Sequence, residues 1–349
     1  MRVAFLRQFH SNRWFSGAQV QAIQTAEALR TLGVQVEFVD TPKDTSYAVL
    51  HVFGLYPDYL PICRVFRARG VPIVLSPIFF KDVSTVLKRV HSASAPYWGR
   101  WSSAYRQLRA LVQTADALLP NTQAEAEFVR RYFRVETPMW VVPNGVDARF
   151  AEGDPRLFRE AFGVQGDFVL CVGRIERRKN QLRLIKALRG TGLPLILVGE
   201  SIARKYLARC QRASDGHVRF LPPLPHDSPL LASAYAACRV FALPSLLETP
   251  GLAALEAGVA GARLVVTPYG GAPEYFGAYA QYPHPRSVSA IRDAIRHAWN
   301  APHDPDAQRQ FLLSRYSWRS VAQQTLQAYQ KVKEQAHGDY RGKPCTLHP

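Results

Sequence analysis

Two cations stand five residues apart in the loop that follows the apolar run Phe168–Val172. The loop spans residues 173–180 and carries Arg174 and Lys179 around a predicted helix start, while Gly173 lets the backbone turn sharply. A helix N-terminus favours anions through its free amides and its dipole. At ~4 Å and an effective dielectric constant of about 20, a cation–phosphate pair contributes ~4 kcal/mol before desolvation. The pattern indicates a phosphate site, and a solvated basic turn is the simpler explanation of it taken alone.

Two carboxylates occupy the loop and helix after the apolar run Val240–Leu243. Glu248 lies before a helix predicted to begin near Gly251, and Glu256 lies in the second turn of that helix, about 7 Å along its axis at a rise of ~1.5 Å per residue. A carboxylate accepts two charge-assisted hydrogen bonds and so suits vicinal hydroxyls. The alternative to a binding role is that Glu248 is an N-cap acid of the helix and Glu256 is a surface residue of the same helix.

A third loop, residues 269–274, contains the glycine pair Gly270 and Gly271 and ends at Glu274. Glycines of this kind allow a backbone to approach a ligand closely, or they form a tight turn.

Strands that end at one sheet edge would bring these loops together. The first half contains five predicted strands, at Arg2–Leu6, Val34–Val39, Val49–Phe53, Pro72–Leu75 and Ala117–Leu119. The second half contains five more, at Phe168–Val172, Leu195–Val198, Val218–Phe220, Val240–Leu243 and Leu264–Thr267. Helical patterns separate the strands, which predicts an α/β fold with two doubly wound parallel sheets. Ligands bind at the carboxyl ends of such strands.

Helix-start signals support this division into strands and helices. Thr122 and Glu125 form a predicted capping box. Asp154 followed by Pro155 is a typical N-cap with proline at the first helical position. The D-x-D sequence at 304–306 is interpreted as a further helix start rather than a metal site.

A chain of 349 residues is longer than one hydrophobic core usually fills. The strong turn at 143–145 divides it into predicted domains of residues 1–147 and 148–316. A last helix, residues 317–335, is expected to pack back on the first domain, and the polar tail 337–349 is expected to be loose.

The composition, 47% apolar and 20% charged, is that of a globular protein. Five scattered cysteines without a C-x-x-C pair indicate neither a disulfide framework nor a zinc site. The apolar start turns polar at Arg7, too early for a signal peptide, and no apolar run approaches the ~18–20 residues of a membrane span. These features predict a cytoplasmic protein.

An excess of basic residues, 44 Lys+Arg against 27 Asp+Glu, gives a net charge of +17 and attraction to polyanions. Residues 81–109 mix cations with aromatic side chains: Lys88, Arg89, Arg100, Arg106 and Arg109 among Tyr97, Trp98, Trp101 and Tyr105. This mixture suits weak docking on an anionic membrane face, and it equally suits a solvated helix with aromatics packed inward.

A nucleic-acid-binding protein is the alternative from another class, but the positive residues are spread widely and no binding motif is present. A dehydrogenase is disfavoured because no G-x-G-x-x-G sequence follows the first strand.

Taken in order, the motifs resemble those of glycosyltransferase family 4, retaining enzymes whose GT-B fold places two Rossmann-like domains on either side of a cleft. The resemblance covers roughly residues 1–335. It rests on Ser16 to Gln19, 143–147, Gly173-Arg174 with Lys179-Asn180, Glu248 with Glu256, Gly270-Gly271 with Glu274, and Tyr316 to Trp318.

The resemblance implies a role for each matching residue. Arg174 and Lys179 would bind the donor diphosphate, and Glu248 would contact hydroxyls of the donor sugar, which makes these three the expected catalytic residues. Glu256 would bind the nucleotide ribose, and the base would lie near residues 199–200 and 220–221. The remaining donor contacts would come from Gly17, which closes over the diphosphate from the first domain, and from Gly173, Gly251 and Leu252.

The implied reaction transfers a sugar with retention from a nucleotide-diphosphate donor to a glycan or lipid-linked acceptor, for example in bacterial surface polysaccharide or glycolipid synthesis. It needs no cofactor and no metal, because cations and helix amides stabilise the departing diphosphate. A GT-B epimerase or phosphorylase is the nearest alternative.

Three departures from the family pattern affect the expected site. Thr249-Pro250 replaces a glycine and an aromatic residue, so position 250 offers no amide. Residues 76–80 lack the histidine that the family often has there, so no catalytic base is assigned. Ser16-Gly17 replaces a glycine pair.

Overall fold

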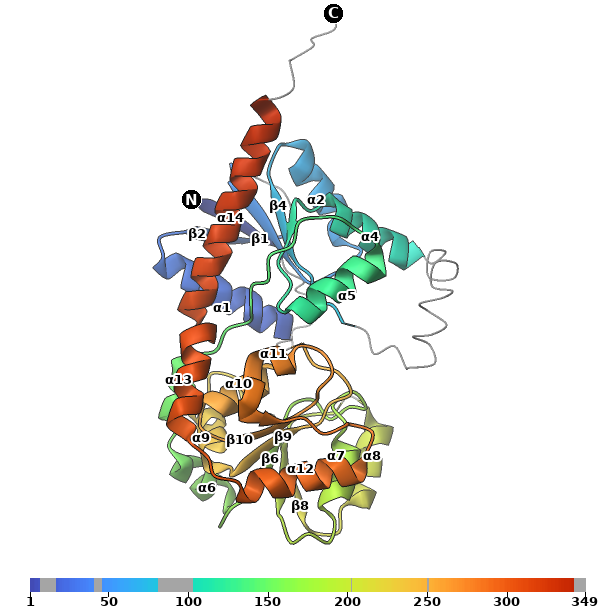
Figure 1. Cartoon of the computed structure of the whole chain (residues 1–349), viewed down its shortest axis with the longest axis vertical. Coiled ribbons are helices and arrows are strands. Elements are labelled where there is room, and N and C mark those ends of the chain that lie inside the picture. The colour runs from blue at the N-terminus through green and yellow to red at the C-terminus, as the bar shows by residue number, and fades with distance from the viewer. Residues whose placement is uncertain (7–16, 41–45, 81–102, 202, 250, 342–349) are drawn as a thin grey trace, which may run out of the picture. The chain divides into compact units, whose positions relative to one another are not determined.

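The computed structural model describes all residues except 7–16, 41–45, 81–102, 202, 250 and 342–349 (Figure 1). The chain divides into two compact units. Unit 1 contains Met1–Gly145 and Trp318–Pro349, and unit 2 contains Val146–Ser317. The first boundary lies two residues before the one expected from the sequence, and the second lies one residue after the expected one.

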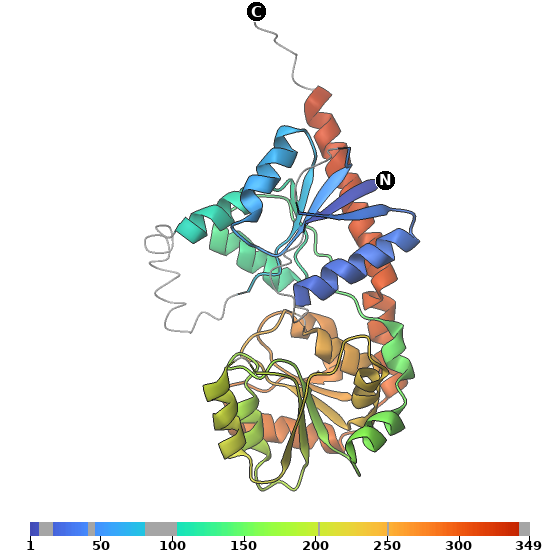
Figure 2. The ribbon, with the colours of Figure 1, turned by 180° about the vertical axis from the view of Figure 1, so that it is seen from behind.

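Unit 1 is built on a parallel sheet of five strands in the order β2-β1-β3-β4-β5. The strands are β1 (Arg2–Leu6), β2 (Gln35–Val39), β3 (Val49–Phe53), β4 (Ile73–Ser76) and β5 (Ala117–Leu118). Alternate residues of β1 face opposite cores: Val3 and Phe5 join one apolar cluster, and Ala4 and Leu6 join the other. Figure 2 shows the sheet between its two helical layers.

Two sets of helices cover the faces of this sheet. The first set, α1 (Gly17–Thr31) and α14 (Trp318–Arg341), packs on the face that contains Val3. The second set covers the other face and contains α2 (Tyr59–Ala68), α4 (Ser103–Thr114) and α5 (Gln123–Phe133).

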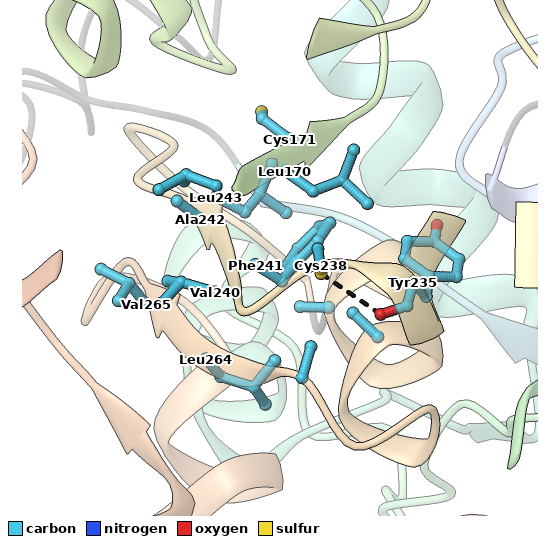
Figure 3. Packing of buried hydrophobic residues seen from close by; sticks show 14 of the residues in the cluster. Leu170, Cys171, Tyr235, Cys238, Val240, Phe241, Ala242, Leu243, Leu264 and Val265 are labelled. Carbon is cyan, nitrogen blue, oxygen red and sulfur yellow. Dashed lines mark hydrogen bonds between the residues drawn. The ribbon is translucent and has the colours of Figure 1, made fainter. Parts of the chain in front are cut away.

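Unit 2 contains six parallel strands in the order β11-β10-β9-β6-β7-β8, the arrangement of nucleotide-binding Rossmann sheets. Its strands are β6 (Val169–Val172), β7 (Leu195–Val198), β8 (Val218–Leu221), β9 (Val240–Leu243), β10 (Arg263–Val266) and β11 (Ala280–Gln281). Figure 3 shows Leu170, Phe241 and Leu264 from neighbouring strands packed in the core. The order changes direction between β6 and β9, which makes the ends of these two strands the expected ligand position.

Helices flank both faces of the second sheet (Figure 1). One layer contains η2 (Ala148–Glu152), α6 (Pro155–Phe162), α9 (Pro229–Ala237), α10 (Leu252–Val259) and α13 (Pro305–Tyr316). The other contains α7 (Gln181–Leu188), α8 (Arg204–Ala213) and α12 (Val288–Asn300). The short helices α11 (Ala272–Phe276) and η3 (Gly277–Tyr279) connect β10 to β11.

The last helix is anchored in unit 1 by a buried polar network. The Tyr329 hydroxyl of α14 lies 2.6 Å from His51 Nδ1, and His51 Nε2 lies 2.9 Å from the Ser76 hydroxyl. Burial lowers the pKa of His51 to about 3, so its imidazole is neutral. Helix α14 continues to Arg341, so the expectation of a loose tail from residue 337 is wrong for 337–341. Extending a helix that is already formed is less costly than starting one, so α14 propagates past its anchored part although Gly338 and Asp339 are poor helix formers.

Several predicted helix starts are confirmed. Asp154 and Asp304 accept hydrogen bonds from the first-turn amides of α6 and α13, with proline at the first helical position in both. The Thr122 hydroxyl accepts from the Glu125 amide, as a capping box requires. The Glu125 carboxylate accepts from the amides of Phe79 and Asn121, at 2.7 and 2.8 Å, so it links α5 to the loop after β4.

Strand ends differ from the predicted ends by one residue in several places. A strand stops where its backbone hydrogen bonds to the neighbouring strand stop, whereas the prediction relied on apolar residues. The two-residue strand β11 is not visible in the sequence pattern. Within the described residues, no helix is long and apolar enough to cross a membrane. The described part of the chain also contains no group of three His, Cys, Asp or Glu residues that could hold a metal ion.

Candidate functional site

The loops after β6 and β9 meet where the strand order of unit 2 changes direction. Lys179 Nζ lies 2.7 Å from Glu248 Oε1, and the two side chains are 14% and 7% exposed. The sequence placed these residues in separate motifs, 69 positions apart, and the fold joins them in one ion pair. A cation and a carboxylate thus share a largely buried site at the carboxyl edge of the sheet.

Arg178 is the second cation at Glu248. Its Nη1 atom lies 3.4 Å from Glu248 Oε1 and 3.1 Å from the Leu247 carbonyl oxygen, and its own carbonyl accepts from the Leu246 amide at 2.8 Å. Burial raises the pKa of Glu248, but the Lys179 ammonium and the Arg178 guanidinium more than offset this and lower the pKa below its ordinary value. Glu248 is therefore ionised at neutral pH.

Asn180 fixes the conformation in which Lys179 reaches this carboxylate. Its backbone is left-handed, with φ 65°, and its Nδ2 atom donates to the carbonyls of Pro244 and Pro285 at 2.8 and 2.7 Å. The buried amide thus ties together the loops after β6, β9 and β11.

The glycine pair after β10 supports the backbone of Glu248. Gly270 has φ +100°, and a Cβ atom there would lie 1.9 Å from the Glu248 carbonyl oxygen. The Glu248 amide donates to the Tyr269 carbonyl at 3.1 Å, and the Gly271 amide donates back to the Glu248 carbonyl at 2.9 Å. The pair thus allows two neighbouring loops to approach closely, whereas close approach of its backbone to a ligand stays a prediction.

Helix α10 begins next to Glu248. Gly251 is its N-cap at φ 76°, Leu252 is its first residue, and a Cβ atom on Gly251 would lie 3.7 Å from Glu248 Oε2. The first amides of a helix have no partner within it and favour an anion. Thr249 precedes this turn, and Pro250 lies outside the described residues.

Arg174 is an exposed residue of the loop after β6. Its side chain is 61% exposed, and its Nη2 atom lies 3.5 Å from Glu176 Oε1. Gly173 opens the loop at φ +142°, and a Cβ atom on Gly199 would lie 2.1 Å from the Gly173 carbonyl oxygen, so the loops after β6 and β7 are in direct backbone contact.

Glu256 forms a separate contact group on α10. Its Oε1 atom lies 2.9 Å from His226 Nε2, and its Oε2 atom accepts from the Tyr235 hydroxyl at 2.8 Å. Burial and the neighbouring Glu256 raise the pKa of Tyr235 well above its ordinary value, so the hydroxyl stays protonated and donates. The alternative of a surface helix residue is wrong for Glu256, which is 5% exposed.

Gly17 lies in unit 1, as the exposed first residue of α1. In the segment 76–80, where no catalytic base was assigned, Ile78 has φ 48°, an uncommon conformation for a branched residue. Of the basic aromatic region, 81–102 lies outside the described residues, and Tyr105 of α4 packs on Tyr132 and Phe133.

Sequence reasoning missed three residues of this site: Arg178, His226 and Tyr235. The run of cations at 177–179 was a signal for Arg178. His226 and Tyr235 had none, because they reach Glu256 from a different loop and helix.

The comparisons with known proteins agree with this architecture. Residues 157–311 match the family model described as glycosyl transferases group 1, and residues 43–150 match glycosyltransferase family 4. A D-inositol 3-phosphate glycosyltransferase of Kribbella flavida is 32% identical over 64% of this chain and 58% of its own length. A glycogen synthase of Mycobacterium tuberculosis is 31% identical over 73% of this chain and 64% of its own length. The chain thus spans about three-fifths of these relatives.

Solved structures show the same fold at low sequence identity. Sucrose-phosphate synthase from Thermosynechococcus elongatus superposes with a TM-score of 0.77 at 18% identity, over 96% of this chain and 99% of its own. Anabaena HepE, in complex with UDP and glucose, gives 0.72 at 19% identity, over 95% and 100%. With both sheets parallel and doubly wound, the chain has the GT-B fold and belongs to the group 1 glycosyl transferases of glycosyltransferase family 4.

Proposed function

We propose that this chain is a retaining glycosyltransferase that uses a nucleotide-diphosphate sugar as donor. The observation that carries the proposal is the Lys179–Glu248 pair at the point where the strand order of a nucleotide-binding sheet changes direction. In such a pair, the lysine can stabilise a negatively charged leaving group, and the carboxylate can accept hydrogen bonds from the hydroxyls of a sugar. The family resemblance likewise implies that Lys179 binds the donor diphosphate and that Glu248 contacts the donor sugar.

The proposed roles follow from the chemistry of each group. Lys179, Arg174 and the first amides of α10, at Gly251 and Leu252, stabilise the negative charge on the departing diphosphate. The ionised Glu248 accepts hydrogen bonds from the donor sugar. Glu256 accepts hydrogen bonds from the ribose hydroxyls.

In the transfer step, the bond between the anomeric carbon and the diphosphate oxygen breaks, and an acceptor hydroxyl forms the new bond on the same face of the sugar. The acceptor proton passes to the departing diphosphate oxygen. This scheme balances without a metal ion or a protein base, and Lys179 is the residue whose loss should slow it most.

The proposed donor carries UDP, and two classes of acceptor are proposed. A neighbouring structure in complex with UDP-glucose supports UDP as the first nucleotide to test. A glycan or lipid-linked acceptor, in surface polysaccharide or glycolipid synthesis, is proposed from the family resemblance. The glycogen synthase among the relatives supports an α-glucan as a second acceptor to test. Peripheral membrane contact remains a prediction.

The experiment is to measure nucleotide release from UDP-glucose and other sugar nucleotides with and without a panel of acceptors. Transfer predicts release that depends on the acceptor and a new glycoside that keeps the donor's anomeric configuration. Release without an acceptor, or sugar epimerisation, would favour a different GT-B reaction.

A further inference from the structure

A chain of polar contacts connects Asp147 with Glu256 through Arg149 and His226. Asp147 caps η2 by accepting from the Arg149 amide at 2.9 Å, and its carboxylate lies 3.4 Å from Arg149 Nε. Arg149 Nη2 then donates to the His226 carbonyl at 2.5 Å. The His226 ring lies 2.9 Å from Glu256 and packs edge-on against Phe150, with 5.9 Å between centroids.

The two partners of Glu256 differ in their surroundings. The Tyr235 hydroxyl, which holds Oε2, belongs to a side chain that is 1% exposed, whereas the His226 side chain at Oε1 is 32% exposed. The Oε1 end of the carboxylate therefore lies beside the accessible loop between β8 and α9. A carboxylate oxygen accepts, so the tautomer of His226 that fits this contact carries its proton on Nε2.

The two contacts leave acceptor capacity on Glu256. An ionised carboxylate offers about four lone-pair directions, and Tyr235 and His226 occupy two of them. Two donors at opposite ends of the group also prevent it from rotating. The directions that remain are therefore fixed in space, which is what recognition of two neighbouring hydroxyls requires.

We propose that His226 is a positioning residue that fixes the Glu256 carboxylate so that the protein distinguishes a ribonucleoside diphosphate from its 2′-deoxy counterpart. Arg149 and Asp147 hold His226 in place, which gives the aspartate of the 143–147 motif a physical role. The inference rests on the proposed function, because it assumes that a nucleotide ribose occupies the Glu256 site.

The test compares thermal stabilisation of the full chain by UDP and 2′-deoxy-UDP, and by the GDP and ADP pairs. Variants His226→Ala and His226→Gln are measured beside the wild type. Glutamine keeps an N–H donor near the position of Nε2, whereas alanine removes it. The matched control is His303→Ala, which deletes a histidine whose Nε2 atom contacts the Gly261 carbonyl, at 2.8 Å, rather than the Glu256 carboxylate.

We expect the wild type to bind its ribonucleotide at least about tenfold more tightly than the deoxy form, since a hydrogen bond to a charged group is among the stronger ones. His226→Ala should reduce that preference to within about threefold, and His226→Gln and His303→Ala should retain it. With a sugar nucleotide that the enzyme converts, His226→Ala should raise KM more than it lowers kcat. The reason is that the ribose contact is present in both the bound substrate and the transition state.

The outcomes separate the two claims. If no nucleotide stabilises the wild type, the proposed function fails and the inference fails with it. If the wild type prefers ribose and His226→Ala keeps the full preference, the proposed function stands and the positioning role is refuted. Should His226→Ala not fold, His226→Leu, which preserves bulk against Phe150, takes its place with the same expected loss.

Discussion

Lys179 and Glu248 form the central ion pair of unit 2, with 2.7 Å between Nζ and Oε1 and both side chains largely buried. The pair depends on three backbone arrangements: the left-handed Asn180 beside Lys179, the Gly270 loop beneath Glu248, and the start of α10 at Gly251. Loops after three different strands thus hold one cation and one anion at the site that we propose for the diphosphate sugar.

Lys179→Ala should reduce turnover by ~10²–10³, the range found when one preorganised anion-stabilising group is removed. The steady-state rate with saturating donor measures this effect. Lys186→Ala is the control, because Lys186 is an exposed lysine of α7, the helix that follows Lys179. Unchanged turnover in the Lys179 variant would show that Lys179 has no part in the chemistry.

Glu248 should make folding stability depend on pH. Its pKa in the folded chain is lowered from the ordinary value of 4.5, so its contribution is complete above about pH 4.5 and is lost as the pH falls through the lower folded value. Denaturant unfolding of wild type and Glu248→Gln between pH 7 and 3 should show a steeper acid loss for the wild type. Parallel curves would contradict the ionised, paired state of Glu248.

His51, in unit 1, should also lower the folding stability as the pH falls. Because its folded pKa is about 3 against an ordinary value of 6.5, the unfolded chain binds the proton first, and stability falls as the pH drops below 6.5. At pH 5 the expected loss is about 2 kcal/mol relative to pH 8. Unfolding of His51→Phe compared with wild type at both values measures it, and an equal loss in both proteins would count against the prediction.

Gly270→Ala should weaken donor binding and lower stability together. The new Cβ atom would overlap the Glu248 carbonyl, and the positive φ adds strain of ~1 kcal/mol or more. The matched variant is Gly192→Ala, where φ is +75° and no atom lies within 4 Å of the added Cβ. Gly192→Ala should show the strain alone, with nucleotide-dependent stabilisation intact. Equal effects of the two substitutions would remove the support role of Gly270.

The framework of the site was predictable because it depends on local patterns. Apolar runs separated by helical spacing predicted the parallel sheets, and the rule that ligands bind at carboxyl strand ends selected the loops of Lys179 and Glu248. The D-x-D sequence was correctly assigned to a helix start, since Asp304 caps α13.

The remaining features depend on contacts between distant parts of the chain. Nothing near Glu125 in the sequence indicates that its carboxylate reaches the Phe79 amide, 46 residues away. The same holds for His226 and Tyr235 at Glu256, because side chains from separate loops and helices meet through packing. The short strand β11 leaves no alternation to detect.

The central claim, a nucleotide-diphosphate site in unit 2, is tested most directly by thermal unfolding with UDP, GDP, ADP and TDP. A ligand at ~100 times its dissociation constant stabilises the folded state by about 2.7 kcal/mol. We predict that at least one nucleotide raises the melting temperature of the wild type and that Glu256→Ala abolishes the rise. No stabilisation by any of the four, or a rise that persists in Glu256→Ala, would contradict the site described here.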